Sequence, residues 1–228
     1  MKQIALDIGL SSGPTLHNFH PGPNQLAHAH LRLWLGPGGA RAARSPVPIY
    51  LWGASGSGKT HLLIALREAL REQGEQAGWM DAGAADPGPF REDWTLVLLD
   101  DVQRYGAVRQ QAAFNWFIHA QAQQCCVIAS GDCVPSALPL REDLRTRLGW
   151  GHVFGLRGLS EPECRAVLRQ AADARGVFLG DEVMDFMLTR FSRDLASLME
   201  LLDLIDAYAM RTKRAITVPM IRAMMEES

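Results

Sequence analysis

A run of small residues that ends in a lysine and a threonine has the clearest chemical meaning in this 228-residue sequence. The run is Gly53-Ala54-Ser55-Gly56-Ser57-Gly58-Lys59-Thr60, which matches the phosphate-loop pattern G-x-x-x-x-G-K-[ST] at every fixed position. Its glycines let backbone N–H groups close around an anion, and a following helix would direct its positive end at the same point. Lys59 would then reach the β- and γ-phosphates, and the Thr60 hydroxyl would ligate Mg²⁺. The run therefore predicts a site for a nucleoside phosphate.

The residues on either side of this run supply the context that a phosphate loop needs. Residues 47–52 are apolar and are expected to form a short buried strand, while leucines recur at helical spacing over residues 62–70. The alternative is a Gly/Ser-rich turn that binds nothing. A strand before the loop and a helix after it favour the phosphate-binding interpretation.

Two carboxylates at the end of a second apolar strand are the expected other half of the site. The strand covers residues 95–99 and is followed by Asp100 and Asp101. Asp100 is placed to bind Mg²⁺ through a water, and Asp101 to orient or deprotonate an attacking water. The alternative is a pair of strand-end carboxylates that cap a neighbouring helix, which the phosphate loop disfavours. Asp101 has a shorter side chain than a glutamate, so its strength as a base stays open.

Three further residues are candidates for the same chemistry. Asp132 follows the next apolar strand, where it would lie beside the γ-phosphate or form an Asx turn before Pro135. Arg147 is a candidate to stabilise a phosphoryl group bound by a neighbouring subunit, because a guanidinium offsets charge on a transferring phosphate. Arg193 opens a long helix from which it could touch the phosphates. For both arginines, chemistry alone favours a solvated side chain.

The order of the expected elements predicts an α/β fold followed by a small helical domain. Strands are also expected over 77–81, 125–129 and 152–156, with helices between them, over 108–121 and around Arg141, Arg145 and Arg147. Such alternation implies a mostly parallel sheet covered on both faces. Residues 36–46 are rich in Gly, Pro and Arg and predict a mobile loop.

Only helices are expected after residue 157. A capping box over 160–163 begins the first, further helices are expected from Asp181 and over 193–211, and Thr217 caps the last. We therefore divide the chain into an N-terminal segment (1–13), a nucleotide-binding domain (14–157) and a helical lid domain (158–228).

Composition limits the classes of function. The chain is 47% hydrophobic and 21% charged, with a net charge of −2, so neither disorder nor a surface for polyanions is indicated. The four cysteines show no C-x-x-C spacing, which argues against a zinc site and a disulfide framework. Without an apolar signal core or a run of membrane length, the protein is expected to be cytoplasmic and to have no membrane partner.

Several segments that occur in one order resemble a known family. They are Phe19-x-x-Gly22-x-Asn24, the phosphate loop, residues 98–103, Ser130-Gly131-Asp132, residues 145–151 and residues 192–195. Together they resemble the AAA+ module of the bacterial replication initiator DnaA, from residue 15 onward. The resemblance implies a parallel five-stranded sheet with a helical lid and a site for ADP or ATP with Mg²⁺. It also implies that Asp132 is sensor 1, Arg147 the arginine finger and Arg193 sensor 2, with an adenine pocket near Phe19 and Asn24.

The N-terminal residues resemble a second known motif. Gln3-Ile4-Ala5-Leu6-Asp7-Ile8 is similar to the Q-L-x-L-x-[LF] peptide that docks on the β sliding clamp, with Gln3 entering a polar pocket and Leu6 and Ile8 an apolar one. Ile4 replaces the usual leucine, and Asp7 is an unusual neighbour. Alone, such a hexamer is more often an edge strand or a tail. On a DnaA-like module that lacks a helix-turn-helix DNA-binding domain, it indicates the family of DnaA regulatory inactivators.

This resemblance implies a regulator of replication initiation. It would hold an adenine nucleotide, dock on the DNA polymerase III β sliding clamp, and promote hydrolysis of DnaA-bound ATP in trans, which inactivates the initiator. Its own turnover would be weak, DNA would be reached only through the clamp, and self-association is possible. Two alternatives remain, a free-standing ATPase of the helicase-loader type and a DnaA-family module that contacts DNA directly.

Overall fold

A computed structural model of the chain describes residues 13–36, 44–83, 87–191 and 195–226. These residues fall into two compact units, one covering Pro14–Gly158 and one formed by the helices after Leu159. The expected clamp-docking residues (3–8), Arg193 and most of the expected mobile loop lie outside the described residues. None of the helices in the described part of the chain is long and apolar enough to cross a membrane.

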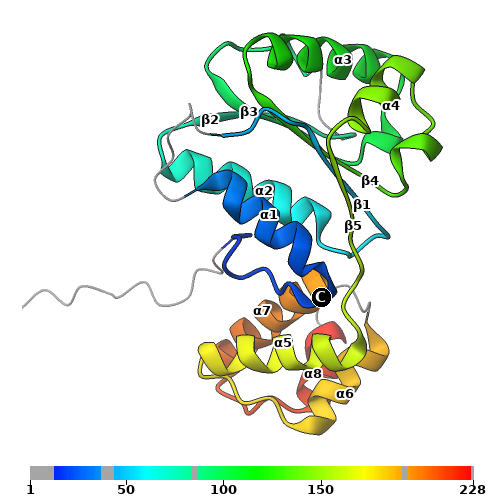
Figure 1. Ribbon diagram of the computed structural model, residues 1–228. Coiled ribbons are helices and arrows are strands. Elements are labelled where there is room, and N and C mark those ends of the chain that lie inside the picture. Colours follow the sequence, from blue (N-terminus) through cyan, green and yellow to red (C-terminus); the bar gives the residue numbers. More distant parts are fainter. Residues whose placement is uncertain (1–12, 37–43, 84–86, 192–194, 227–228) are drawn as a thin grey trace, which may run out of the picture. The chain divides into compact units, whose positions relative to one another are not determined.

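A five-stranded, fully parallel sheet forms the centre of the first unit (Figure 1), which confirms the predicted fold class. The strand order is β2-β3-β4-β1-β5. The strands are β1 (Ile49–Trp52), β2 (Gln76–Met80), β3 (Trp94–Leu99), β4 (Cys126–Gly131) and β5 (His152–Gly155). Two bounds differ from prediction by two residues, and the other strand bounds differ by at most one. β1 begins at Ile49, because Pro48 has no N–H to donate, and β4 runs through Ser130 and Gly131, which pair with the end of β1.

Helices cover both faces of this sheet, as the alternating sequence predicts. The helices α1 (Gln25–Leu35) and α2 (Lys59–Glu72) lie on one face, and α3 (Ala107–Ala122) and α4 (Glu142–Leu148) lie on the other (Figure 1). Successive strand residues supply the two cores in turn. Ile49 and Leu51 pack with α1 and α2, whereas Tyr50 packs with α3 and α4. The strands are thus buried on both faces, as parallel strands require.

Helix α2 is anchored by a continuous apolar stripe. Leu62, Leu63, Leu66 and Leu70 are fully buried against the sheet. Burying a leucine side chain stabilises a fold by roughly 1.5–3 kcal/mol. Because these leucines fix α2, they also fix its first residue, Lys59, at the end of the phosphate loop.

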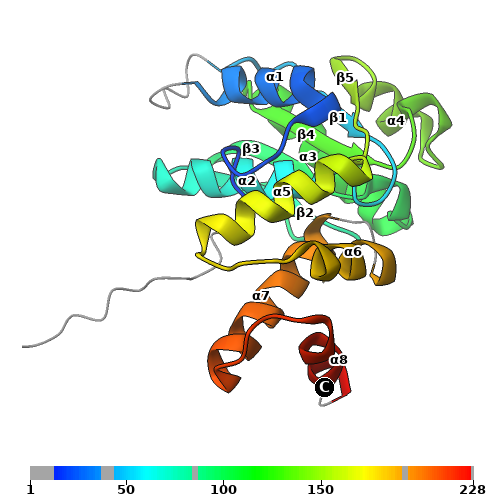
Figure 2. The same cartoon turned by 90° about the horizontal axis from the view of Figure 1, so that it is seen from below.

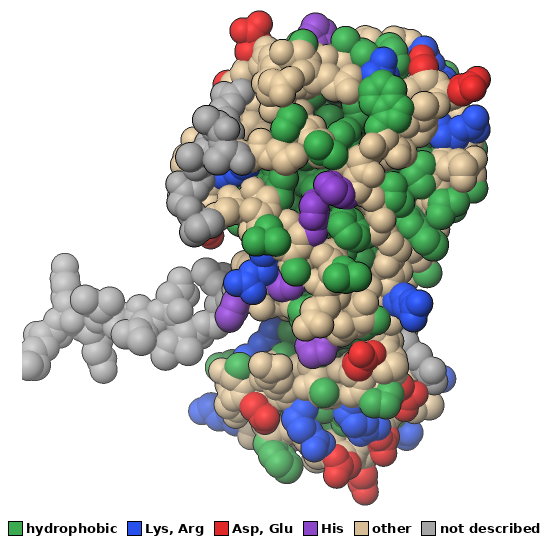
Figure 3. Space-filling view, in the orientation of Figure 1, with side chains coloured by type: hydrophobic (Ala, Val, Ile, Leu, Met, Phe, Trp, Pro, Cys, Tyr) green, Lys and Arg blue, Asp and Glu red, His purple; other side chains and the backbone are tan. Residues whose placement is uncertain are grey.

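The second unit is helical, and its first helix has the predicted capping box. Its helices are α5 (Glu161–Ala174), α6 (Asp181–Arg190), α7 (Leu195–Thr212 as described) and α8 (Val218–Glu226). Ser160 and Glu163 bond reciprocally at the start of α5. Ion pairs such as Arg169–Asp181 and Arg175–Asp203 link neighbouring helices. Basic and acidic side chains are intermixed on the face of this unit seen in Figure 3.

Two leucines on α1 offer a matched test of the core. Leu31 is fully buried in the α1–α2 core, whereas Leu33 is 80% exposed. We expect Leu31→Ala to lower the free energy of unfolding by about 2–5 kcal/mol, because it leaves a cavity. Leu33→Ala should change it by less than about 0.5 kcal/mol. Urea unfolding followed by circular dichroism measures both, and equal effects would contradict this packing.

Candidate functional site

The strand order brings the predicted phosphate-site residues to one edge of the sheet. The phosphate loop follows β1, Asp100 and Asp101 follow β3, and Asp132 follows β4. Since β4 lies between β3 and β1 and all three strands are parallel, their carboxyl ends are adjacent. β4, which ends just before Asp132, is thus the neighbour of β1, which ends just before the phosphate loop. The Asp132 side chain is exposed.

The phosphate loop adopts a conformation that depends on its glycines. Gly56 and Gly58 have φ angles of 76° and 91°, which L side chains rarely adopt. A Cβ on Gly58 would also lie 2.7 Å from Cε2 of Phe19. Within the described chain, the Ser57 hydroxyl is buried in this loop without a hydrogen-bond partner. A tight glycine turn and an unpartnered buried hydroxyl fit a site that accepts an anion.

Lys59 is buried at the start of α2 and is held by the loop itself. Its Nζ donates to the carbonyl oxygens of Gly53 and Ala54, at 2.8 and 2.9 Å. Burial lowers the pKa of Lys59, and the nearby carboxylates of Asp101, Asp100 and Asp132 oppose that shift. Two carbonyl oxygens of the loop therefore fix the ammonium group at the start of α2.

Asp100 is bound by two hydroxyl groups from different elements. Thr60 Oγ1 donates to Asp100 Oδ2 at 2.8 Å, and Ser130 Oγ donates to Oδ1 at 2.5 Å. The pKa of Asp100 is raised, because the effect of burial is larger than the opposing effect of these two hydrogen bonds. A carboxylate and a hydroxyl are oxygen ligands of the kind that Mg²⁺ prefers, so Thr60 and Asp100 fit a magnesium site.

Asp101 lies in a left-handed turn directly after Asp100. Its φ is 52°, and its backbone N–H donates to Ser130 Oγ at 2.9 Å. Gln103 Nε2 donates to Asp101 Oδ1 at 3.3 Å, and an Arg104 nitrogen lies 3.8 Å from Oδ2. Nothing in the sequence pattern had assigned a role to Ser130, although it lies in the quoted Ser-Gly-Asp segment.

The two residues expected near the adenine, Phe19 and Asn24, both make contacts within the first unit. Asn24 Nδ2 donates to the Arg157 carbonyl, and the Arg157 N–H donates to Asn24 Oδ1, both at 2.8 Å. Phe19 lies between His28 and His61, with ring centroids 5.4 and 5.5 Å away. Asn24 therefore joins the start of α1 to the end of the first unit, and Phe19 packs against Gly58. Sequence spacing could not reveal the Asn24–Arg157 pair, since 133 residues separate them.

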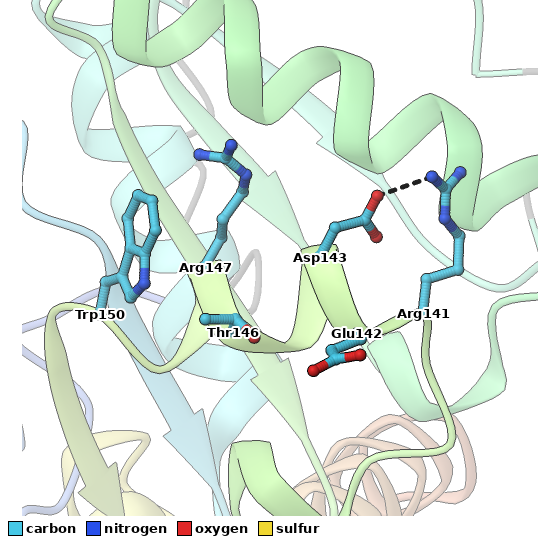
Figure 4. Close-up of a pocket in the computed structure, with 6 residues that line it drawn as sticks. All are labelled: Arg141, Glu142, Asp143, Thr146, Arg147 and Trp150. Atoms are coloured by element: carbon cyan, nitrogen blue, oxygen red, sulfur yellow. Dashed lines mark hydrogen bonds and ion pairs between the residues drawn. The ribbon is translucent and has the colours of Figure 1, made fainter.

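Arg147 lies in the last turn of α4, and Figure 4 shows it beside Trp150. Its guanidinium lies over the rings of Trp150 and Phe114, at 4.8 and 5.4 Å, and donates to Gln121 Oε1 at 2.8 Å. The nearby Asp143 pairs with Arg141 at 2.7 Å. The described partners of Arg147 are thus two aromatic rings and an amide, all of them uncharged. An open depression of about 660 Å³ adjoins it, lined by Arg141, Glu142, Asp143, Thr146, Arg147 and Trp150.

Comparison with known proteins agrees with this architecture. Residues 161–225 match the family described as Hda, lid domain. Domain III of DnaA from Thermotoga maritima superposes with a TM-score of 0.73 at 20% identity, over 93% of this chain and 95% of that chain. The chain belongs to the Hda/DnaA-like AAA+ family.

Two further proteins are similar to this chain, one in sequence and one in fold. An uncharacterized protein of Haemophilus influenzae is 32% identical over 233 residues, which cover 97% of both chains. AMPPCP-bound DnaA from Aquifex aeolicus superposes with a TM-score of 0.64 at 22% identity, over 85% of this chain and 65% of that chain. In that structure the Aquifex aeolicus DnaA holds AMPPCP, an adenine nucleotide analogue.

The Asn24–Arg157 pair gives a prediction that needs no ligand. Asn24→Asp keeps the acceptor for the Arg157 N–H but places a carboxylate oxygen against the Arg157 carbonyl. We expect the free energy of unfolding to fall by about 1–3 kcal/mol, because a buried polar group loses its partner. Asn18→Asp, at an exposed position where the side-chain oxygen accepts from the Thr15 N–H, is the control. Equal stability of the two variants in urea unfolding would contradict the role of Asn24.

Proposed function

We propose that this protein binds ADP or ATP with Mg²⁺, docks on the DNA polymerase III β sliding clamp, and promotes hydrolysis of DnaA-bound ATP in trans. Hydrolysis converts the initiator to its inactive form. The observation that carries this proposal is Arg147, a half-buried arginine on an exposed surface whose described partners are Trp150, Phe114 and Gln121.

The nucleotide part of the proposal rests on the residues at the carboxyl edge of the sheet. The loop from Gly53 to Gly58 would hold the phosphates with its N–H groups, and Lys59 would donate to them. Thr60 and Asp100 would hold Mg²⁺, which neutralises phosphate charge when bound. Asp101 and Asp132 would face the γ-phosphate. We propose that this site acts as a conformational switch with weak turnover of its own, with Arg193 contributing from the lid.

The trans part of the proposal rests on where Arg147 lies. It belongs to α4, on the face of the sheet opposite α2, and each contact described above is to α3 or to the turn after α4. Aromatic rings hold a guanidinium in place without neutralising it, because cation–π attraction leaves the charge available. An arginine fork of this kind suits the phosphate oxygens of a nucleotide held by another protein.

The docking part of the proposal rests on sequence alone. Gln3, Ile4, Leu6 and Ile8 have the spacing of a clamp-binding peptide, and they precede the first core element. We accordingly propose three functional parts, a clamp-binding segment (1–13), the AAA+ domain (14–157) and the lid (158–228). Docking on a clamp would raise the local concentration of Arg147 near DnaA on DNA, with no need for direct DNA contact.

Substitution of Arg147 separates action in trans from action on the protein's own nucleotide. Arg147→Ala should retain nucleotide and clamp binding but lose stimulation of DnaA-ATP hydrolysis, by roughly 10³–10⁵ where fingers are fully engaged. Arg147→Lys should restore little, since a point charge lacks the planar fork. Phosphate release from DnaA-ATP with clamp-loaded DNA is the assay. Full stimulation by the alanine variant would place the finger elsewhere, with Arg145→Ala as the next test, and loss of nucleotide binding would mean that Arg147 acts in cis.

Substitution in the N-terminal segment tests the docking. The double variant Gln3→Ala, Leu6→Ala removes the polar and apolar anchors together, so clamp binding should become undetectable while nucleotide affinity stays unchanged. Ser11→Ala, Ser12→Ala, in the same segment but outside the hexamer, is the control. Surface plasmon resonance on immobilised clamp measures both. Equal clamp binding by the two double variants would rule out the docking peptide.

A further inference from the structure

Ser130 is a fully buried hydroxyl that contacts both carboxylate residues of the site. It lies next to the end of β4, with no exposed surface. Its Oγ donates to Asp100 Oδ1 at 2.5 Å and accepts from the Asp101 N–H at 2.9 Å. The hydroxyl of Ser130 therefore donates one hydrogen bond and accepts another, and its two partners are consecutive residues at the end of β3.

The position of Ser130 in the sheet explains why it can do so. β3 and β4 pair in register up to Leu99 and Ala129, so Asp100 and Ser130 would be the next pair. At this point β3 stops pairing with β4. The Asp100 N–H still bonds to the Met80 carbonyl of β2 at 2.8 Å, and Asp101 then turns into the left-handed region. The Ser130 hydroxyl thus links β4 to the end of β3 just where the turn at Asp101 begins.

The two oxygens of Asp100 are divided between partners of different kinds. Oδ2 accepts from Thr60, a residue that a bound Mg²⁺ would share, whereas Oδ1 accepts from Ser130, which belongs to the sheet. If Thr60 turns toward a metal ion, Ser130 still fixes the rotation of the carboxylate. A hydrogen bond to a buried charged group is among the stronger ones in proteins, so its loss should be measurable.

We propose that Ser130 is a positioning residue that orients Asp100 toward Mg²⁺ and holds the turn that presents Asp101. The inference rests on the proposed binding of a Mg²⁺-nucleotide, and it is independent of DnaA and the clamp. The Ser-Gly-Asp segment would then serve the site through two residues, the buried Ser130 and the exposed Asp132. Gly131 between them has no room for a side chain, because a Cβ there would collide with the Tyr50 hydroxyl.

The test compares three variants of Ser130 that differ in whether they keep its size or its hydroxyl. Ser130→Cys keeps the size but is a weak donor, Ser130→Ala removes the group, and Ser130→Thr retains the hydroxyl. Thr95→Val is the matched control, because it removes a buried hydroxyl from the opposite end of β3, where Thr95 bonds the Gln76 carbonyl at 3.1 Å. Binding of a fluorescent ADP analogue is titrated over a range of Mg²⁺ concentrations and again in EDTA.

We expect the cysteine and alanine variants to need about tenfold more Mg²⁺ for half-maximal effect, with affinity in EDTA unchanged. Ser130→Thr should restore the midpoint, and Thr95→Val should leave it unaltered even if it lowers stability. Parental midpoints in folded cysteine and alanine variants would overturn the role of Ser130 alone. If the alanine variant does not fold, the cysteine–threonine comparison decides. A parent chain that binds no nucleotide would overturn the proposed nucleotide site, and with it this inference.

Discussion

The burial of two opposite charges, on Lys59 and Asp100, is the constraint on which the rest of the site depends. Their residues are only 7% and 6% exposed, and an unpaired buried charge is very costly. The fold compensates each charge with groups from several elements. Loop carbonyls hold the ammonium, and hydroxyls of Thr60 and Ser130 hold the carboxylate. These partners meet only because β4 lies between β1 and β3, so strand order and charge burial support each other.

The surface around Arg147 is stabilised by different interactions from those at Lys59 and Asp100. Around Arg147 the described partners are two aromatic rings and an amide, and the adjacent Asp143 is engaged by Arg141. The guanidinium held in this way has no carboxylate among its described partners, and Arg147 is partly accessible. In the function that we propose, one domain carries a site for its own nucleotide and an arginine that acts on a nucleotide held elsewhere.

Local sequence patterns predicted much of this fold and less of its site. The phosphate loop, the alternation that gives a parallel sheet and the Ser160–Glu163 capping box depend on neighbouring residues, so they could be predicted. The bonds of Asn24 to Arg157 and of Ser130 to Asp100 join distant segments, and they follow from strand order instead of spacing. The bonds of Asn24 show this, because their partner is the backbone of Arg157, 133 residues further along the chain.

The fate of ATP held by DnaA tests the central claim most directly. DnaA is loaded with radiolabelled ATP, freed of excess nucleotide, and mixed with this protein in the presence of unlabelled ADP, with or without clamp-loaded DNA. We expect labelled ADP on DnaA to accumulate rapidly only when the protein and the clamp-loaded DNA are both present. If the protein does not change the rate at which labelled ADP forms on DnaA, even with clamp-loaded DNA present, action in trans is contradicted.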